Sequence, residues 1–380
     1  MTKKSDAPAI RFKGFSDAWE QRKFEEIAVR SSVICSDDTL PRVEYEDIVS
    51  GTGRLNKDIY AKQSIKSGIA FHQGDVLYGK LRPYLQNWLL PTFDGLAVGD
   101  FWVLQPQNAD SSFLYRLIQS RQFDEVANQS TGTKMPRADW KLVSKTVFSI
   151  PSNISEQAAI GTYFTALDSL ITLHQRKFEK LTNVKKSMLE KMFPQNGSSY
   201  PEIRFKGFTD PWEQRKAKEI CSIGTGKSNT QDQVDDGKYP FYIRSDVPVR
   251  SNKYLYDCEA VITIGDGNIG KVFHYVNGKF DLHQRCYKIT DFKDIWGKYF
   301  FYYFSTKFYD RAMKMTAKAT VDSVRLEMIS EMDIKKPPQI SEQKQIAEFF
   351  ANLDNLITLH QRELEKLQNI KKSMLEKMFV

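Results

Sequence analysis

Residues 155–193 read SEQAAIGTYFTALDSLITLHQRKFEKLTNVKKSMLEKMF, and residues 341–379 repeat that sequence as SEQKQIAEFFANLDNLITLHQRELEKLQNIKKSMLEKMF. The two segments are identical at 27 of 39 positions. A shorter pair precedes them, because residues 10–23 (IRFKGFSDAWEQRK) and 203–216 (IRFKGFTDPWEQRK) share 12 of 14 positions. A repeat of this size decides the organisation: the chain of 380 residues is built twice from one plan.

The segments between the repeats, residues 24–154 and 217–340, show almost no mutual similarity. Drift after a tandem duplication would spread similarity evenly along each copy, so drift alone is the weaker explanation. The stretch PQNGSSYP (194–201) joins the copies, because its prolines and glycine cannot continue a helix. The sequence therefore predicts, in chain order, a first globular domain over 1–154, a long helix over 155–193, a linker over 194–202, a second globular domain over 203–340 and a long helix over 341–380.

Apolar residues recur in alternating steps of four and three along both 39-residue segments. This heptad seam, sustained over four to five heptads, favours a coiled coil over an ordinary surface helix. The positions expected to pair are Ile160, Phe164, Leu167, Ile171, His174, Phe178 and Leu181 in the first segment, and Ile346, Phe350, Leu353, Ile357, His360, Leu364 and Leu367 in the second. At 1.5 Å per residue, each helix would be about 58 Å long.

Polar residues interrupt the seam at His174 and Lys185 in the first copy and at His360 and Lys371 in the second. A polar residue at a seam position sets the register of a coiled coil at some cost in stability. That interpretation is favoured for the two histidines over a metal-binding or pH-sensing role.

The helix starts also repeat. Ser155 and Ser341 stand where an N-cap is expected, and a serine oxygen at that position accepts a backbone N–H of the first turn. Glu156 and Glu342 follow them, and a carboxylate is favoured at the positive end of the helix dipole.

The two variable blocks have the pattern of mixed α/β domains, with short apolar runs typical of strands followed by a helix. In the first block we expect strands over 75–78 and 101–104 and a helix over 112–128. In the second block we expect strands over 260–264, 271–275 and 286–289 and a helix over 294–315. The fold class is therefore α+β or mixed, with two α/β globular domains joined by two long helices in a pseudo-twofold repeat.

Two glycine-rich motifs look like nucleotide-binding loops but lack the required context. GDGNIG (265–270) fits the dinucleotide pattern, yet the residues after it alternate like a strand up to Gly278, which we interpret as a turn. We therefore predict a glycine hairpin. GTGKS (224–228) lacks the first glycine of a P-loop, because Cys221 occupies that position. Without a nucleophile motif, a methyltransferase tetrapeptide or a metal-ligand pattern, the sequence predicts no catalytic residue and no metal site.

Composition excludes several other classes of protein. The chain is 41% hydrophobic and 27% charged, with a mean hydropathy of −0.48, which is ordinary for a soluble globular protein. No window approaches 18 consecutive apolar residues and no apolar segment follows the N-terminus, so we expect neither a membrane span nor a signal peptide. The four cysteines are far apart, which predicts no disulfide framework and a cytoplasmic location.

The net charge of +8 suggests a polyanionic partner. Basic side chains gather in loops beside aromatic residues, and Arg and Gln can contact bases while Lys and Tyr hold phosphates. The candidate DNA-binding residues are Lys80, Arg82, Tyr84, Lys134, Arg137, Arg244, Lys271, His283, Gln284, Arg285, Lys318 and Arg325. Residues 24–150 carry 14 Lys and Arg against 15 Asp and Glu, so a DNA-binding surface there depends on how the charge is distributed.

This organisation resembles the DNA-specificity (S) subunits of bacterial type I restriction-modification enzymes. The resemblance covers essentially the whole chain. Besides the two lead-in repeats, it is carried by GKLRPYL (79–85), GTKMPRADW (132–140), the PS-x-x-SEQ helix entry (151–157) and the GKF and HQR motifs within 278–285. It implies two target recognition domains that each read one half-site of a bipartite DNA target, with the long helices pairing antiparallel as a spacer. One departure is PPQ at 337–339, which lacks the serine after proline, so capping of the second helix is expected to differ.

The resemblance also implies partners and cofactors. Two methylation (M) subunits would dock on the long helices, bring S-adenosylmethionine and flip an adenine out of the duplex. Restriction (R) subunits would bring the ATP and Mg needed by the motor and nuclease. The chain itself would bind double-stranded DNA, no membrane and no cofactor. The alternative from another class is a DNA-binding regulatory or architectural protein that acts alone.

Overall fold

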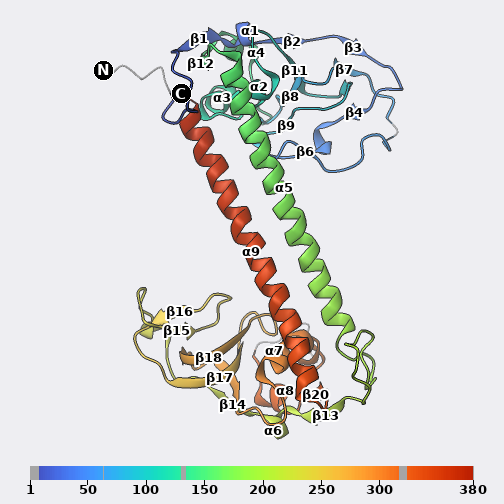
Figure 1. Cartoon of the computed structure of the whole chain (residues 1–380), viewed down its shortest axis with the longest axis vertical. Helices are drawn as coiled ribbons and strands as arrows, with labels where there is room; N and C mark the ends of the chain where they lie inside the picture. The colour runs from blue at the N-terminus through green and yellow to red at the C-terminus, as the bar shows by residue number, and fades with distance from the viewer. Residues whose placement is uncertain (1–7, 63, 130–133, 316–322, 380) are drawn as a thin grey trace. The chain divides into compact units, whose positions relative to one another are not determined.

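The computed structural model describes residues 8–62, 64–129, 134–315 and 323–379. Contacts divide the chain into two compact units: unit 1 contains residues 1–175 and 361–380, and unit 2 contains residues 176–360. Each unit therefore combines one globular domain with the start of one long helix and the end of the other (Figure 1).

The long helices are α5 (Ile154–Lys191) and α9 (Ile340–Met378). Both are continuous, which confirms the prediction made from the 39-residue repeat. Their N-caps differ from the expected serines, because Ser155 and Ser341 lie inside the helices. Asn153 caps α5: its side chain accepts the Ser155 N–H (2.8 Å) and its carbonyl accepts the Gln157 N–H (3.2 Å).

Before α9, the residue that takes the place of Asn153 is Gln339. Its carbonyl accepts the Gln343 N–H (3.3 Å), and its side-chain amide donates to Asp210. The two helix entries therefore differ in their capping residue, as the PPQ sequence at 337–339 predicted.

The lead-in repeats form matching strands in the two units. In unit 1, β1 (Trp19–Lys23) pairs antiparallel with β12 (Val147–Pro151), the strand just before α5. In unit 2, β13 (Glu213–Lys216) pairs in the same way with β20 (Asp333–Lys336), just before α9. One-turn helices follow the lead-in strands, α1 (Phe24–Ile27) and α6 (Ala217–Ile220).

An arginine of each lead-in is bonded to the first turn of the following long helix. Arg11 donates two hydrogen bonds to the Glu156 carboxylate, from Nε (2.6 Å) and Nη2 (2.7 Å). Arg204 makes the same two bonds to Glu342, at 2.7 and 2.8 Å. Both glutamates are fully buried, so each pair is a charge-assisted lock between the two repeated sequences of one copy.

The next helix residue is also used in the same way in both copies. The Gln157 side chain donates to the Pro151 carbonyl (2.8 Å) and accepts the Asp110 N–H (2.9 Å). The Gln343 side chain donates to the Pro337 carbonyl (2.9 Å) and accepts the Trp296 N–H (2.8 Å). These bonds explain why the SEQ sequence occurs at both helix starts.

Within each unit the two helix segments run antiparallel. In unit 1, Asp168 of α5 pairs with Lys371 of α9 (2.7 Å), and the earlier Phe164 lies against the later Phe379. In unit 2, Lys185 pairs with Asp354 (2.5 Å), and the later Phe193 stacks on the earlier Phe350. The two lysines that interrupt the seam therefore form ion pairs with the partner helix.

Each of these aspartates also holds the globular domain of its unit. Arg116 donates to Asp168 (2.7 Å) in unit 1, and the Tyr302 hydroxyl donates to Asp354 (2.8 Å) in unit 2. Arg116 is a buried cation with 3% of its side chain exposed. Asp168 and Asp354 are thus equivalent points where the two long helices and a domain helix meet.

Besides α1 and the β1–β12 pair, the described part of the globular domain of unit 1 has two four-stranded sheets and three further α-helices. One sheet has the order β2 (Ala28–Ser31), β11 (Phe101–Pro106), β8 (Val76–Gly79), β9 (Trp88–Leu89). The other has the order β3 (Ile34–Cys35), β7 (Gly68–Phe71), β10 (Gly95–Ala97), β4 (Arg42–Val43), and a small hairpin joins β5 (Ile48–Val49) to β6 (Arg54–Leu55). The helices are α2 (Ser111–Leu117), α3 (Arg121–Ala127) and α4 (Trp140–Lys145).

The single helix predicted over 112–128 is wrong. It divides into α2 and α3 because Ser120 acts as an N-cap, accepting the Phe123 N–H at 3.3 Å. The strands predicted over 75–78 and 101–104 are confirmed as β8 and β11.

The globular domain of unit 2 is built on one six-stranded sheet. Its order is β14 (Ser222–Thr225), β19 (Cys286–Thr290), β17 (Tyr256–Ile264), β18 (Phe273–Leu282), β15 (Tyr239–Tyr242), β16 (Val249–Ser251). Two helices follow, α7 (Gly297–Lys314) and α8 (Leu326–Ser330). The three strands and the helix predicted for this block correspond to β17, β18, β19 and α7.

The glycine hairpin predicted at 265–270 is confirmed, since β17 and β18 pair antiparallel on either side of it. The turn predicted at Gly278 is wrong. Gly278 lies inside β18 with φ +133°, a conformation that glycine tolerates and other residues rarely adopt.

The seam residues occupy two environments. Ile160, Phe164 and Leu167 are buried in the core of unit 1, and Ile346, Phe350 and Leu353 are buried in the core of unit 2. Of the later positions, Leu364 is buried, while Ile171, His174, Phe178, Leu181, Ile357, His360 and Leu367 are half-buried. The first three positions of each seam therefore complete the core of a globular domain.

Candidate nucleic-acid interface

In unit 1, three chain segments meet where β8 ends and β11 begins. Lys80 directly follows β8, Asp100 directly precedes β11, and Leu81 forms an isolated bridge with Arg137. Arg82 is joined to the same place by its backbone N–H, which donates to the Pro136 carbonyl (2.7 Å). The fold therefore brings together basic residues that are more than 50 positions apart in the sequence.

Asp100 is the centre of this cluster. Arg137 donates to its two oxygens, from Nε (3.3 Å) and Nη2 (3.0 Å), and Lys80 Nζ lies 3.6 Å away. The hydrogen bonds from Arg137 hold the pKa of Asp100 below its usual value, and they raise the pKa of Arg137 in return. The carboxylate thus stays ionised and fixes two cations at the surface.

The other unit 1 candidates lie in the exposed loops around this cluster. Arg82 is exposed and has left-handed backbone geometry (φ 48°), which is uncommon for a residue other than glycine. Tyr84 and Lys134 are also exposed. Because these side chains are exposed and not part of a core, they can contact a polyanion without disturbing the packing of the domain.

In unit 2, the matching cluster is built on Asp266, in the glycine hairpin after β17. Arg285 Nη1 lies 2.8 Å from one Asp266 oxygen, and Arg244 Nη1 lies 3.3 Å from the other. Burial alone would raise the pKa of Asp266, but hydrogen bonds from Arg285 and Arg244 hold it below its usual value. Arg285 and Arg244 therefore share one carboxylate.

Two neighbours of Arg285 have structural roles. His283 is buried, and its Nδ1 accepts the Arg285 N–H (3.1 Å). Burial and the nearby arginines lower the pKa of His283, which favours the neutral ring. The Gln284 amide donates to Asn229 Oδ1 (2.6 Å). A cleft beside these residues is lined by Thr225, Gly265, Asp266, Gln284, Arg285, Tyr287, Ser323 and Val324.

Two other described candidates of unit 2, Lys271 and Arg325, contact groups other than Asp266. Lys271 Nζ lies over the Tyr309 ring of α7 (5.8 Å), and Arg325 donates to the Met315 carbonyl (3.3 Å) just after that helix. Lys318 lies outside the described residues. Of the seven candidates in this unit, the structure thus joins Arg244, His283, Gln284 and Arg285 in one place.

Sequence reasoning missed the two organising carboxylates, Asp100 and Asp266. It selected basic residues by their number and by neighbouring aromatic residues, and an acidic residue counts against a DNA-binding surface in such a search. The usable signal was position, because Asp100 directly precedes β11 and Asp266 lies two residues after the end of β17.

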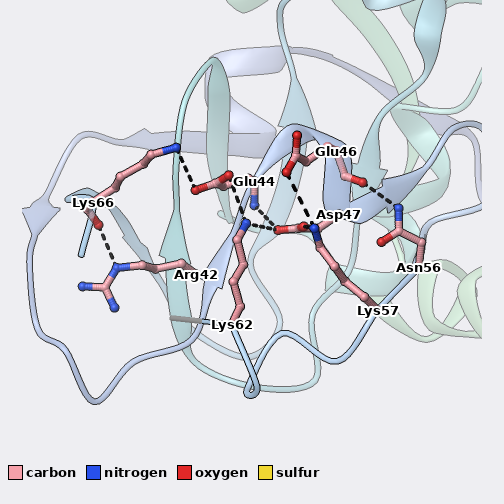
Figure 2. A network of polar contacts seen from close by, with 8 residues as sticks. All are labelled: Arg42, Glu44, Glu46, Asp47, Asn56, Lys57, Lys62 and Lys66. Atoms are coloured by element: carbon pink, nitrogen blue, oxygen red, sulfur yellow. Dashed lines mark hydrogen bonds and ion pairs between the residues drawn. The ribbon is translucent and has the colours of Figure 1, made fainter. Parts of the chain in front are cut away.

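A second charged network was also missed, and Figure 2 shows it in unit 1. The buried carboxylate of Asp47 pairs with Lys57 (2.7 Å) and Lys62 (3.0 Å), while Glu44 pairs with Lys62 (3.0 Å) and Lys66 (3.2 Å). These pairs fasten Lys57, Lys62 and Lys66 to the short turn that follows β4. We call this network the lysine clasp.

The outer faces of the long helices carry a repeated apolar pattern. Leu170 and Leu173 of α5 are exposed, and so are their counterparts 186 positions later, Leu356 and Leu359 of α9. Shallow grooves along α5 (176–188) and α9 (362–374) are lined by matching residue types, namely Arg, Glu, Lys, Asn, Val or Ile, Ser and Met. Each unit therefore displays one copy of the leucine pair and one of the groove.

Within the described ranges, no three His, Cys, Asp or Glu side chains are placed to hold a metal ion. None of the helices described is both long and apolar enough to cross a membrane. The four cysteines are free thiols, and burial raises the pKa of Cys221 and of Cys286 to about 12. A high thiol pKa works against nucleophilic catalysis at these positions.

Comparison with known proteins gives concordant matches. The sequence model of a family described as the type I restriction modification DNA specificity domain matches twice, at residues 32–183 and 209–369. The chain is 24% identical over 336 residues to the type I restriction enzyme MjaVIII specificity subunit of Methanocaldococcus jannaschii, covering 76% of this chain and 77% of that protein. It is 25% identical over 185 residues to the EcoDI specificity subunit of Escherichia coli, covering 46% and 41%.

Solved structures show a similar fold. The S subunit of a type I restriction-modification system from M. genitalium superposes with a TM-score of 0.71 at 14% identity, covering 98% of this chain and 99% of that one. A chain from a study of complex assembly and conformational transition in a type I R-M system superposes with a TM-score of 0.51 at 17% identity, covering 94% and 96%. At these identities the likeness concerns the fold alone.

Proposed function

This chain belongs to the family of type I restriction modification DNA specificity domains, and we propose that it is the subunit that gives such a restriction-modification complex its sequence specificity. The observation that carries the proposal is the double match, since each matched segment covers a globular domain and most of the long helix after it. Two different domains in one repeated frame suit a bipartite target, with one domain for each half-site.

The chemistry of methylation and cleavage would come from partner subunits. Motifs for binding S-adenosylmethionine or ATP are missing from the sequence, and the clusters at Asp100 and Asp266 are arranged to hold cations rather than to transfer protons. S-adenosylmethionine would be bound by methylation subunits, and ATP and Mg by restriction subunits. Because the target is DNA, the complex would act in the cytoplasm.

We further propose that two methylation subunits dock on the long helices, one on each unit. The support is the repetition of the outer helix surface, because the same exposed leucine pair and the same groove occur once in each unit. Two equal surfaces that differ only in position suit two copies of one partner rather than two different proteins.

The test is co-expression of the chain with the methylation subunit of the same system, followed by purification and native mass spectrometry. We expect one chain with two methylation subunits, and methylation of one bipartite DNA motif when S-adenosylmethionine is supplied. A chain that binds DNA tightly but retains no methylation subunit would instead support a regulator that acts alone.

Matched variants test the docking surfaces. Replacing Leu170 and Leu173 with serine in unit 1 is expected to remove one methylation subunit, and replacing Leu356 and Leu359 is expected to remove the other. Val247→Ser is the control, because Val247 is also an exposed apolar residue but lies in the globular domain of unit 2. Full 2:1 assembly with all four leucines replaced would show that these faces are not the docking surfaces.

A further inference from the structure

The clusters at Asp100 and Asp266 lie on the same backbone frame. In unit 1, Lys80 N–H donates to the Asp100 carbonyl (2.9 Å), and Ala138 N–H donates to the Lys80 carbonyl (2.9 Å). In unit 2, Gly265 N–H donates to the Arg285 carbonyl (2.7 Å), and Val324 N–H donates to the Gly265 carbonyl (2.7 Å). We call these the unit 1 junction (residues 80–81, 100 and 137–138) and the unit 2 junction (265–266, 285 and 323–324).

The third segment enters both junctions in the same way. An isolated bridge joins Leu81 to Arg137 in unit 1 and Asp266 to Ser323 in unit 2. Arg137 and Ser323 are 186 positions apart, which is also the offset between the two long helices. The two junctions are therefore equivalent places in the repeated plan, although the blocks that contain them show almost no sequence similarity.

The side chains at the equivalent positions differ in chemistry. Lys80 corresponds to Gly265, Leu81 to Asp266, Asp100 to Arg285, and Arg137 to Ser323. Where the repeated plan serves structure, as in the Arg11–Glu156 and Arg204–Glu342 locks, the residues are the same in both copies. Here the backbone is retained and the side chains are exchanged, which is what two domains that read different sequences require.

The acid in each junction orients basic groups. The ion pair in unit 2 uses Nη1 of Arg285, and the guanidinium still carries N–H donors on Nε and Nη2 along one edge. The ion pair in unit 1 uses Nε and Nη2 of Arg137, so the remaining N–H donors of that guanidinium, on Nη1 and Nη2, lie along its terminal edge. Two donors on one edge match the O6 and N7 acceptors of guanine in the major groove. A carboxylate that fixes the rotamer of such an arginine lowers the entropy lost when the base is bound.

We propose that the two junctions are the base-reading elements of the two units, with Arg137 and Arg285 as reading side chains and Asp100 and Asp266 as positioning residues. This inference rests on the proposed function, because it assigns the reading of each half-site to named residues. The ligand at each junction is a base edge of the duplex, and a guanine is the base that an arginine recognises best. Lys80 and Arg244, on the same carboxylates, serve the neighbouring base or phosphate.

The experiment measures the methylated motif of the assembled complex by methylome sequencing, together with competition binding against duplexes substituted at each base pair. The wild-type chain first has to give one bipartite motif, and that result tests the proposed function separately. The variants are Arg285→Ala, Asp266→Asn and Asp266→Glu in unit 2, and Arg137→Ala in unit 1. Asp236→Asn is the control, because Asp236 is an exposed carboxylate in a turn of unit 2.

Arg285→Ala is expected to reduce discrimination about tenfold to a hundredfold at one or two positions of one half-site. Arg137→Ala is expected to do the same in the other half-site. Asp266→Asn should have a smaller effect at the position affected by Arg285→Ala, and Asp266→Glu should restore part of it. The thermal midpoint of each variant, measured on the full chain, separates a change in reading from a loss of folding.

Three results would overturn the inference. The first is an unchanged motif and unchanged discrimination in Arg285→Ala and Arg137→Ala. The second is equal weakening of binding to all duplexes, which would assign the arginines to phosphates. The third is a change in the same half-site for variants of both units.

Discussion

The buried lock between Arg11 and Glu156 gives the most quantitative prediction of stability. Glu156 has 1% of its side chain exposed and accepts two hydrogen bonds from Arg11, which is itself 17% exposed. Arg11→Ala would leave a buried carboxylate without its cation, and breaking a buried ion pair in this way typically costs about 3–5 kcal/mol. We expect a loss of about 3–4 kcal/mol, because Arg11 is partly exposed and a water molecule can replace part of its hydrogen bonding to Glu156.

The effect should appear in unit 1, which contains 195 residues. At about 2–4 °C per kcal/mol for a unit of this size, the midpoint of its thermal transition would fall by roughly 6–16 °C. Urea unfolding of the full chain gives the free energy, and hydrogen exchange of peptides from each unit shows which one has lost stability.

A double-mutant cycle identifies the cause. Replacing Arg11 and Glu156 together with leucine should recover most of the loss, because the buried charge is then absent as well. Arg22→Ala is the matched control, since Arg22 forms an exposed pair with Glu20, and such pairs contribute about 1 kcal/mol or less. A loss of unit 1 stability in Arg11→Ala no larger than that in Arg22→Ala would show that the buried ion pair does not stabilise the unit in this way.

Three further predictions concern other parts of the molecule. The pKa values of Glu44 and Asp47 are held below their usual values, because the bonds to lysines outweigh the cost of burial. The lysine clasp should therefore be stable above about pH 4 and be lost as the pH falls through the lowered pKa values, which amide exchange of residues 56–66, corrected for intrinsic rates, would detect as a loss of protection. Asp168→Ala would strand the buried Arg116, whereas Asp354→Ala leaves the neutral Tyr302 hydroxyl, and each variant also removes the partner of one partly exposed lysine, Lys371 or Lys185. We expect losses of about 2–4 and about 1–2 kcal/mol, respectively, in urea unfolding, and equal losses would argue against the buried Arg116 charge as the cause. Inserting one heptad into both α5 and α9 adds about 10 Å to each helix, or about three base pairs of duplex, so methylome sequencing should find the same half-sites with a gap longer by one to three base pairs. A four-residue insertion should instead abolish assembly, and an unchanged gap in an active heptad variant would show that the helices do not set the spacing.

The repeated parts of the chain were the most predictable from sequence. Their identity at 27 of 39 positions and the heptad spacing predicted both long helices to within two residues. What the repeat alone could not show is which retained residues touch. Arg11 and Glu156 have the counterparts Arg204 and Glu342 in the second copy. Arg11 and Glu156 are 145 positions apart, and only the fold brings them into contact.

Local rules failed where a neighbouring group competed with them. The helix predicted over 112–128 is interrupted because the Ser120 side chain caps a new helix, α3, instead of continuing the turn of α2. Gly278 was interpreted as a turn, but the pairing of β18 with β17 accommodates its positive φ within the strand. In both cases the local residue types suit the predicted element, but contacts with other residues favour a different one.

The candidate DNA-binding residues were predictable as a set, but their grouping was not. Arg244 and Arg285 are 41 positions apart and meet only because Asp266 lies between them. Lys271 and Arg325 belonged to the same set, yet Lys271 lies over the Tyr309 ring of α7, and Arg325 donates to the Met315 carbonyl just after that helix. The equivalence of the two junctions was also hidden, because it rests on backbone hydrogen bonds that leave no pattern in the side chains.

The central claim is that each globular domain reads one half-site independently of the other. The most direct measurement is methylome sequencing of a complex in which residues 24–150 are replaced by the corresponding block of another specificity subunit. One half-site is expected to change to that of the donor, while the other half-site and the gap stay as they were. A motif in which both half-sites change would contradict it.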